Sequence, residues 1–199
     1  MKPQDHLTIL KKLFIENSVV KDAKSGYIVA KPFNLCIDSD VLEIASRCWA
    51  NEYRKNDIDA IVGLPDAGAR LVSILANMLG ISTILPAKRS SILPGAWENI
   101  VSYENDSFTT GQKGIQSHIG FVQPKMKILV IDDVIARGNT AVAAIKALQA
   151  KGAIVVGLGA LFDKVWQNGA VQIEKETGVK AFSLISIQTI SEAGEIHIL

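Results

Sequence analysis

The sequence predicts an α/β fold in which helices cover both faces of a mainly parallel sheet. Short apolar runs of strand length alternate along the chain with segments whose apolar residues recur at the helical period. Two strand–loop–helix units carry a glycine in the loop, and their strands are apolar throughout, which is typical of strands buried on both faces. With 199 residues and 48% apolar content, the chain fits a single domain, residues 1–199, with a core of its own.

The first part of the chain predicts a helix followed by irregular or β structure. Apolar residues recur at helical spacing across 5–17, and a turn at Gly26 precedes the apolar residues 27–29. Asp38 opens a cluster of helix-capping residues, which predicts a helix that runs to about Lys55.

The first strand–loop–helix unit spans residues 58–80. An apolar strand is expected over 58–64, and Pro65 keeps the residue before it extended. Gly68 permits a tight turn, after which a helix ends at Gly80.

A strand predicted at 81–86 leads into the least regular region, residues 87–121. This region is polar along much of its length, and it separates two apolar strands. Long polar segments of this kind are either flexible excursions or functional lids. We expect a mobile lid near residues 91–111.

The second strand–loop–helix unit spans residues 127–152. Its strand, expected over 127–131, ends in the adjacent carboxylates Asp132 and Asp133, and Gly138 lies in the loop that follows. A helix is predicted from Asn139 to a stop at Gly152, because alanine, isoleucine and leucine recur there at helical spacing. The remaining chain predicts strands at 154–162 and 181–187, a helix around 170–177, and a possible edge strand at 196–199.

The loop after the paired aspartates has the character of a sugar-phosphate site. Ligands of open α/β folds bind at the carboxyl ends of the strands, and a helix N-terminus offers unpaired N–H groups to a phosphate. The carboxylates can accept hydrogen bonds from a diol, or reach Mg²⁺ through water. The alternative is an ordinary turn with two exposed acids, which is disfavoured because paired carboxylates repel each other without a ligand or counter-charge.

The segment IDDVIARGNT resembles the phosphoribosyl-pyrophosphate (PRPP) motif of type I phosphoribosyltransferases. The resemblance implies a Rossmann-like phosphoribosyltransferase fold with a hood, about residues 1–38, and a flexible β-hairpin lid. It also implies that Asp132 and Asp133 are the catalytic acids, which orient the ribose hydroxyls and contact Mg²⁺ through water. The 5-phosphate would lie on Ala136, Arg137, Gly138, Asn139 and Thr140. Arg137 departs from the family pattern, in which a small polar residue is common.

Two further segments are implied to bind the pyrophosphate of PRPP. By the resemblance, Asp66, Ala67 and Gly68 belong to the loop whose backbone N–H groups hold it. Lys88 and Arg89 would add positive charge, across a dimer interface in one arrangement, although the same pair is equally consistent with solvated charge at a strand end.

The resemblance also points to a base-binding region. The run from Asp163 to Gly169 is similar to the EK-x-F-Q-x-G run of xanthine phosphoribosyltransferases. An ammonium group only donates hydrogen bonds, so Lys164 would read a carbonyl oxygen and favour a 6-oxopurine over adenine. Trp166 is either a stacking face for the base or an ordinary core aromatic. Asn34 matches the hood segment that binds the base, and Tyr27, or Ile28 if the register shifts by one, matches the residue seven positions before it.

Composition and charge exclude several other classes of protein. The chain carries 21 basic and 20 acidic residues, a net charge of +1, so no nucleic-acid-binding or membrane-binding patch is expected. No apolar run is long enough to cross a bilayer, and no signal-peptide core is visible at the N-terminus. Two cysteines are too few for a disulfide framework, which favours a cytoplasmic protein. The resemblance adds a homodimer as the expected assembly.

The sequence therefore predicts a purine phosphoribosyltransferase of purine salvage. It would transfer the 5-phosphoribosyl group of PRPP to a purine base, with xanthine or another 6-oxopurine favoured, and release pyrophosphate. The alternatives are an adenine or orotate phosphoribosyltransferase and a non-catalytic regulator that senses PRPP. The histidine-containing mobile loop of the orotate enzymes is absent from the sequence.

Overall fold

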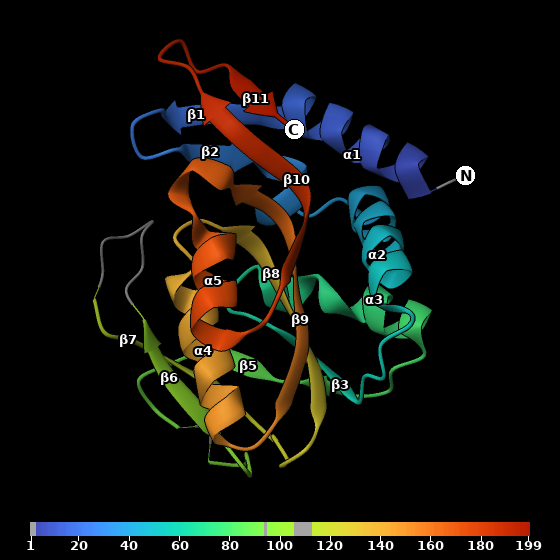
Figure 1. The fold of residues 1–199 in the computed structure, drawn as a ribbon, viewed down its shortest axis with the longest axis vertical. Coiled ribbons are helices and arrows are strands. Elements are labelled where there is room, and N and C mark those ends of the chain that lie inside the picture. The colour runs from blue at the N-terminus through green and yellow to red at the C-terminus, as the bar shows by residue number, and fades with distance from the viewer. Residues whose placement is uncertain (1–2, 94, 106–112) are drawn as a thin grey trace.

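A six-stranded sheet forms the centre of the molecule (Figure 1). The structure is a computed structural model that describes residues 3–93, 95–105 and 113–199. The strand order is β11-β10-β9-β8-β3-β4, and all neighbours pair in parallel except β10 and β11. The strands are β3 (Ala60–Gly63), β4 (Ile84–Leu85), β8 (Lys127–Ile135), β9 (Ile154–Lys164), β10 (Ala181–Ile190) and β11 (Ile196–Ile198). The predicted α/β fold with a mainly parallel sheet is confirmed.

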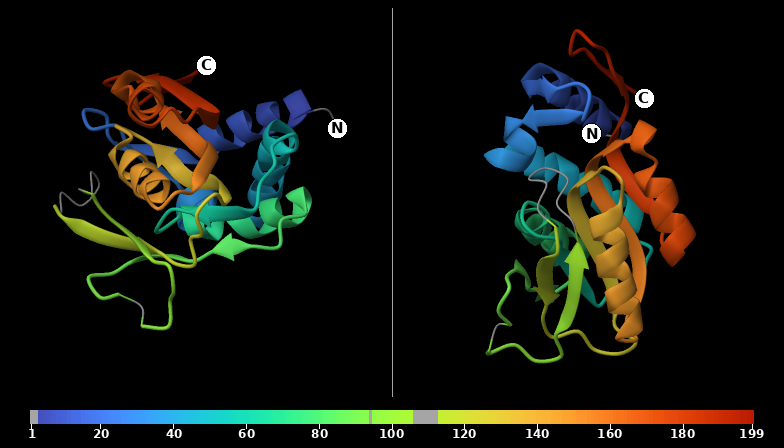
Figure 2. Two further views of the ribbon diagram at one scale, coloured as in Figure 1. Left: turned by 60° about the horizontal axis from the view of Figure 1, so that its bottom comes forward. Right: turned by 90° about the vertical axis from the view of Figure 1, so that its left-hand side faces the viewer.

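Helices cover both faces of this sheet (Figures 1 and 2). One face carries α1 (Pro3–Asn17), α2 (Ser39–Tyr53) and α3 (Val72–Leu79), and the other carries α4 (Asn139–Ala150) and α5 (Gly169–Thr177). Alternate residues of each strand point to opposite cores. In β8, Leu129 and Ile131 pack with the first group of helices, whereas Ile128 and Val130 pack with the second. Each such fully buried side chain contributes about 1.5–3 kcal/mol of transfer free energy, which explains the apolar strands.

The N-terminal segment lies over the carboxyl ends of the central strands (Figure 1). After α1, an antiparallel hairpin forms from β1 (Ser18–Asp22) and β2 (Tyr27–Ala30), and a single π-helical turn, Lys31–Leu35, follows. Phe14 packs this segment onto the sheet. The centre of its ring lies 5.5 Å from that of Phe33 in the turn and 5.1 Å from that of Phe162 in β9. Asp38 caps α2 by accepting from the amides of residues 40 and 41, as predicted.

A second, three-stranded antiparallel sheet projects beside α4. Its strands are β5 (Ala87–Arg89), β6 (Val101–Asn105) and β7 (Ile115–Ile119), in the order β5-β7-β6. Val101 and Tyr103 are buried in the same cluster as α4, so this sheet is packed on the domain. The predicted lid of 91–111 maps onto it in part, and residues 94 and 106–112 lie outside the described residues.

Two strands extend past the ends that the sequence predicts. Strand β8 continues through Asp132 and Asp133 to Ile135, and β9 continues to Lys164. The reason is mutual pairing, because Asp132 stands opposite Ala160 and Ile135 opposite Asp163. In contrast, β4 is much shorter than predicted. The chain after Gly80 first makes a turn, in which the amide of Ile81 donates to the carbonyl of Ala76.

Candidate active site

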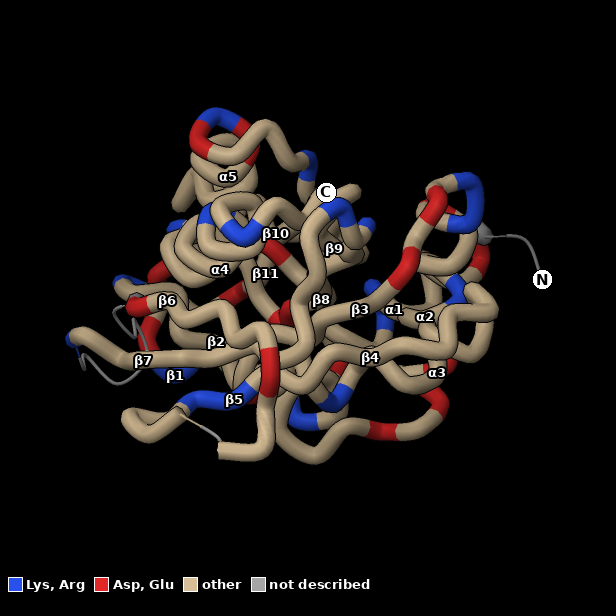
Figure 3. The backbone as a smooth tube through the Cα atoms, turned by 90° about the horizontal axis from the view of Figure 1, so that it is seen from below, with Lys and Arg blue, Asp and Glu red and all other residues tan. Residues whose placement is uncertain are grey.

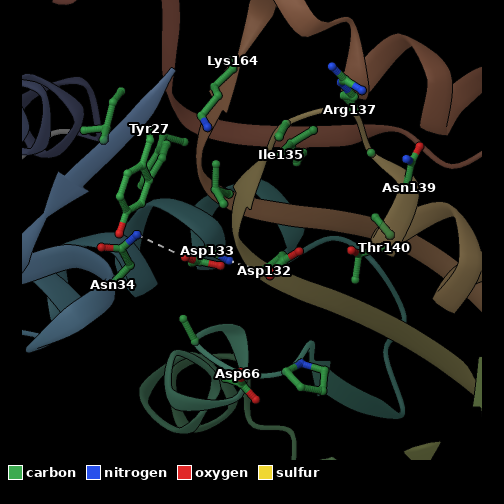
Figure 4. Close-up of a pocket in the computed structure, with 18 of the residues that line it drawn as sticks. Tyr27, Asn34, Asp66, Asp132, Asp133, Ile135, Arg137, Asn139, Thr140 and Lys164 are labelled. Atoms are coloured by element: carbon green, nitrogen blue, oxygen red, sulfur yellow. Dashed lines mark hydrogen bonds between the residues drawn. The ribbon is translucent and has the colours of Figure 1, made fainter. Parts of the chain in front are cut away.

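A cavity of about 660 Å³ lies at the carboxyl ends of β3, β8 and β9 (Figure 4). It brings together segments that are far apart in the sequence: the N-terminal hairpin, the loops after β3 and β8, and the ends of β5 and β9. Most of the predicted site residues line it, namely Tyr27, Asn34, Asp66, Ala67, Arg89, Asp132, Asp133, Ala136, Arg137, Gly138, Asn139, Thr140 and Lys164. Three others do not, namely Gly68, Lys88 and Trp166.

The paired aspartates form the floor of the cavity. Asp132 is 8% exposed, and its Oδ1 accepts a hydrogen bond of 2.9 Å from the backbone amide of Asp133. Asp133 is more exposed, and its Oδ2 accepts a hydrogen bond of 3.3 Å from Nδ2 of Asn34. Burial, and then the charge of Asp133, raise the pKa of the Asp132 carboxyl well above its usual range. Two acids held this close favour a ligand that brings hydroxyl donors or a cation.

The loop between β8 and α4 forms one wall. Gly138 is the N-cap of α4 and has a left-handed backbone, with φ at 80°. A side chain there would be crowded as well as strained, because a Cβ would lie 2.7 Å from the carbonyl oxygen of Gly169. Asn139 and Thr140 begin the helix at the edge of the cavity, whereas the side chain of Arg137 points away from its centre (Figure 4). An anion can therefore approach the open end of α4 through backbone N–H groups.

Gly68 supports the site from behind and does not line it. A Cβ at this position would lie 2.7 Å from the carbonyl oxygen of Ile131 and 3.0 Å from Cα of Asp132. Gly68 therefore allows close backbone packing under the acid pair, and its proposed place in the pyrophosphate loop stays a prediction. Asp66 and Ala67, from the same loop, do face the cavity.

The basic pair on β5 is split between two faces of the strand. Arg89 lines the cavity, and its Nη1 lies 3.2 Å from Oδ2 of Asp66. Lys88 is exposed and lies outside the cavity. The difference follows from the two-residue period of a strand, which sends neighbouring side chains to opposite faces. Of the two alternatives for this pair, solvated charge fits Lys88 and a site residue fits Arg89.

A model of the phosphoribosyl transferase domain matches residues 38–191, which is most of the chain. The chain belongs to the phosphoribosyltransferase family. This family consists of enzymes of the glycosyltransferase type, and the matched span contains both loops and both acids described above.

Relatives of this phosphoribosyltransferase carry two different base names. A xanthine phosphoribosyltransferase of Streptococcus agalactiae is 30% identical over 155 residues, covering 76% of this chain and 78% of the relative. An adenine phosphoribosyltransferase of Acidiphilium cryptum is 31% identical over 151 residues, covering 76% of this chain and 85% of the relative.

Solved structures confirm the fold of the phosphoribosyltransferase. The adenine phosphoribosyltransferase of Trypanosoma brucei superimposes with a TM-score of 0.74 at 20% identity, over 93% of this chain and 82% of that one. The enzyme of the same name from Rhodothermus marinus gives 0.73 at 20% identity, over 92% and 99%. Among the described residues, no helix of the phosphoribosyltransferase is long and apolar enough to cross a membrane.

The end of the cavity under the N-terminal hairpin combines apolar and polar side chains. Lys164 is 7% exposed, and its ammonium end points into the cavity (Figure 4). Burial lowers the pKa of Lys164, and the charge of Asp133 partly opposes this shift. Tyr27 and Asn34 approach from the hairpin and the π-helical turn, and Ile135 presents an apolar side chain opposite them (Figure 4).

Trp166 does not line this cavity, where the first of its two alternatives, a stacking face for the base, would place it. Because β9 continues through Lys164, the chain turns only at Val165–Gln167 and carries Trp166 into a neighbouring hollow. The indole there crosses Gly26, where a Cβ would lie 2.7 Å from its ring. Trp166 therefore packs against the turn of the N-terminal hairpin.

Several cavity residues were missed by the sequence reasoning, among them Ile135, Arg70 and Lys113. Ile135 belongs to the extension of β8. Had the strand been predicted to continue past Asp133, its two-residue period would have placed Asp133 and Ile135 on the same face. Arg70 and Lys113 also line the cavity, and no local pattern distinguishes them from solvated surface cations.

The acid pair makes the ligand-free protein less stable as the pH rises. The pKa of Asp132 is raised in the folded protein, so its stabilising contribution is present below the ordinary carboxyl range and is lost as the pH rises through the raised value. Asp132→Asn removes this loss. We expect urea unfolding in magnesium-free buffer to show the variant gaining on the order of 1 kcal/mol or more over the wild type across this window. If the free energies of unfolding of the two proteins change with pH in the same way, the raised pKa is contradicted.

Proposed function

We propose that this phosphoribosyltransferase transfers the 5-phosphoribosyl group from PRPP to a 6-oxopurine, with xanthine favoured, in purine salvage. The observation that carries the proposal is the joining of three features in one cavity: an acid pair, an open helix N-terminus and a buried lysine. The acids suit ribose hydroxyls, the helix end suits the 5-phosphate, and the lysine suits a carbonyl on the base. The relatives named for xanthine and for adenine support a purine as the acceptor.

The reaction breaks the bond between the anomeric carbon and pyrophosphate and forms a bond from that carbon to a ring nitrogen. The pyrophosphate leaves with the electron pair, and the base loses the proton of the ring nitrogen. Glycosidic displacements of this kind pass through an oxocarbenium-like state, so the protein mainly aligns the reactants and excludes water. Asp132 and Asp133 orient the ribose, the amides of 136–140 hold the 5-phosphate, and Arg89 with the loop at Asp66 faces the pyrophosphate.

The carboxylate pair also fits Mg²⁺. Magnesium is bound through one or two carboxylates together with waters and substrate phosphates, and Asp132 and Asp133 supply such oxygens. Within 3–93, 95–105 and 113–199, no group of three or more His, Cys, Asp or Glu side chains gathers that would hold a metal ion by itself. Bound Mg²⁺ would neutralise charge on the leaving pyrophosphate. We therefore propose that turnover requires Mg²⁺ and stops when EDTA removes it.

The preference for a 6-oxopurine is supported by hydrogen-bond polarity. A carboxylate only accepts, so Asn34 must turn its NH₂ group toward Asp133, which leaves Oδ1 of Asn34 as an acceptor. Lys164 is a donor at the same end of the cavity. Because an ammonium only donates, Lys164 can pair with the carbonyl of a 6-oxopurine but not with the exocyclic amine of adenine.

Replacing Lys164 with methionine tests this preference. The change keeps the length of the side chain and removes the donor. We expect kcat/KM for the 6-oxopurine to fall about 100-fold, since a buried carbonyl then loses its partner, while any turnover of adenine stays the same or rises. Lys180→Met, at an exposed position just before β10, is the matched control. An equal loss for both bases in Lys164→Met would contradict a role in base selection.

A non-catalytic PRPP sensor is the competing function. Basic and acidic residues are interspersed along the described chain, with no basic face evident in the view of Figure 3, which favours an enzyme. The experiment combines pyrophosphate release from PRPP with each purine in turn and a gel shift against bulk nucleic acid. Pyrophosphate release that depends on one base supports the enzyme, and a gel shift without turnover supports the sensor. The homodimer remains a proposal, to be tested by light scattering.

A further inference from the structure

Arg70 links two walls of the cavity, the loop after β3 and the N-terminal turn Lys31–Leu35. It ends the 3₁₀ turn Gly68–Arg70 in the loop after β3, which we propose binds the pyrophosphate, and it lines the cavity. Its guanidinium reaches the N-terminal segment, where Nη2 donates to the carbonyl of Asn34 and Nη1 to the carbonyl of Leu35, each at 3.2 Å. Both carbonyls belong to the π-helical turn Lys31–Leu35.

The turn held by Arg70 carries Asn34, which lines the cavity. The Nδ2 of Asn34 is anchored on Asp133, while Oδ1 is buried and no donor in the described parts of the chain reaches it (Figure 4). A buried acceptor without a partner costs about 1–3 kcal/mol, so other contacts must hold the turn in this position. The direction of Oδ1 depends on the backbone of Asn34, and Arg70 holds that backbone by two parallel hydrogen bonds.

We infer that Arg70 is a positioning residue for base recognition, acting through Asn34. This inference rests on the proposed function. The rigid, planar guanidinium can hold two adjacent carbonyls at once, and a lysine ammonium cannot reproduce this fork. Arg70 thus connects the loop proposed for pyrophosphate to the turn that carries Asn34, and it keeps the Asn34 side chain beside Asp133 in the cavity.

Steady-state kinetics of Arg70→Met and Arg70→Lys test this role. We expect KM for the base to rise about tenfold in Arg70→Met, the effect of about one net hydrogen bond, with kcat and the KM for PRPP within about twofold of wild type. Arg70→Lys should recover only part of the loss. Arg47→Met removes an exposed arginine that pairs with Glu43 on α2, and it should leave all constants unchanged. The melting temperatures of the variants show whether folding is affected, and Arg70 is itself exposed.

A double variant separates positioning from direct contact. If Arg70 acts through Asn34, the variant with Asn34→Ala and Arg70→Met should bind the base no more weakly than Asn34→Ala alone. Additive losses, an unchanged KM for the base, or a rise confined to the KM for PRPP would each overturn the inference while leaving the proposed function in place. A wild-type protein that turns over no purine would refute the proposed function, and the inference with it.

Discussion

Replacing both Asp132 and Asp133 with asparagine is expected to lower PRPP-dependent turnover about 1000-fold, a loss typical of removing preorganised electrostatic groups. The side chains keep their shape and can still hydrogen-bond, but they no longer attract Mg²⁺ or orient the ribose as charged acceptors. Because Asp132 is 8% exposed and burial disfavours its charge, the neutral pair should also fold at least as stably as the wild type. Pyrophosphate release and urea unfolding measure the two effects.

The control for the acid pair is Asp57→Asn. Asp57 is a largely exposed carboxylate whose Oδ2 accepts from the ammonium of Lys127, far from the cavity. Exposed pairs of this kind contribute little to stability, so turnover and unfolding should change by small amounts. Turnover that survives in the double variant at the level of Asp57→Asn would remove the acids from the mechanism.

The second large effect is expected at Gly138. Gly138→Ala places a Cβ 2.7 Å from the carbonyl oxygen of Gly169 on a backbone with φ at 80°. The start of α5 must move or the loop must change its conformation, and either shift displaces the amides proposed to hold the 5-phosphate. We expect KM for PRPP to rise about 100-fold and the free energy of unfolding to fall by about 2 kcal/mol or more.

Gly178→Ala separates backbone strain from crowding. Gly178 caps α5 with φ at 72°, and no heavy atom of the described chain lies within 4 Å of the position of an added Cβ. This variant should lose about 1 kcal/mol of stability and bind PRPP like the wild type. If Gly138→Ala matches Gly178→Ala both in its KM for PRPP and in its free energy of unfolding, the loop before α4 does not hold the phosphate.

The order and type of the main elements follow from local patterns. Apolar period, the cap at Asp38 and the left-handed glycines 80 and 138 are all properties of neighbouring residues, and they predict the helices and the strand–loop–helix units. The ends of the strands were not predictable in this way. The extension of β8 to Ile135 depends on pairing with β9, whose residues lie about thirty positions further along the chain.

The candidate site shows the same division between local and long-range information. The acids and the phosphate loop are contiguous in sequence, so a motif reveals them. Asn34 and Asp133 are 99 positions apart, and the hydrogen bond between them exists only because the π-helical turn packs over β8. Arg70 and Ile135 also enter the cavity through contacts between distant parts of the chain, Arg70 with the turn at residues 34 and 35 and Ile135 with β9. Trp166 was assigned to the base because its run resembles one in the family, and the longer strand β9 carries it to the neighbouring hollow.

The most direct measurement is a crystal structure of this protein with PRPP and magnesium. We predict that the 5-phosphate lies against the backbone amides of residues 136–140, with the ribose hydroxyls on Asp132 and Asp133. Electron density for PRPP at any other place, or no density at that helix end at saturating PRPP, would contradict the assignment of this cavity as the phosphoribosyl site.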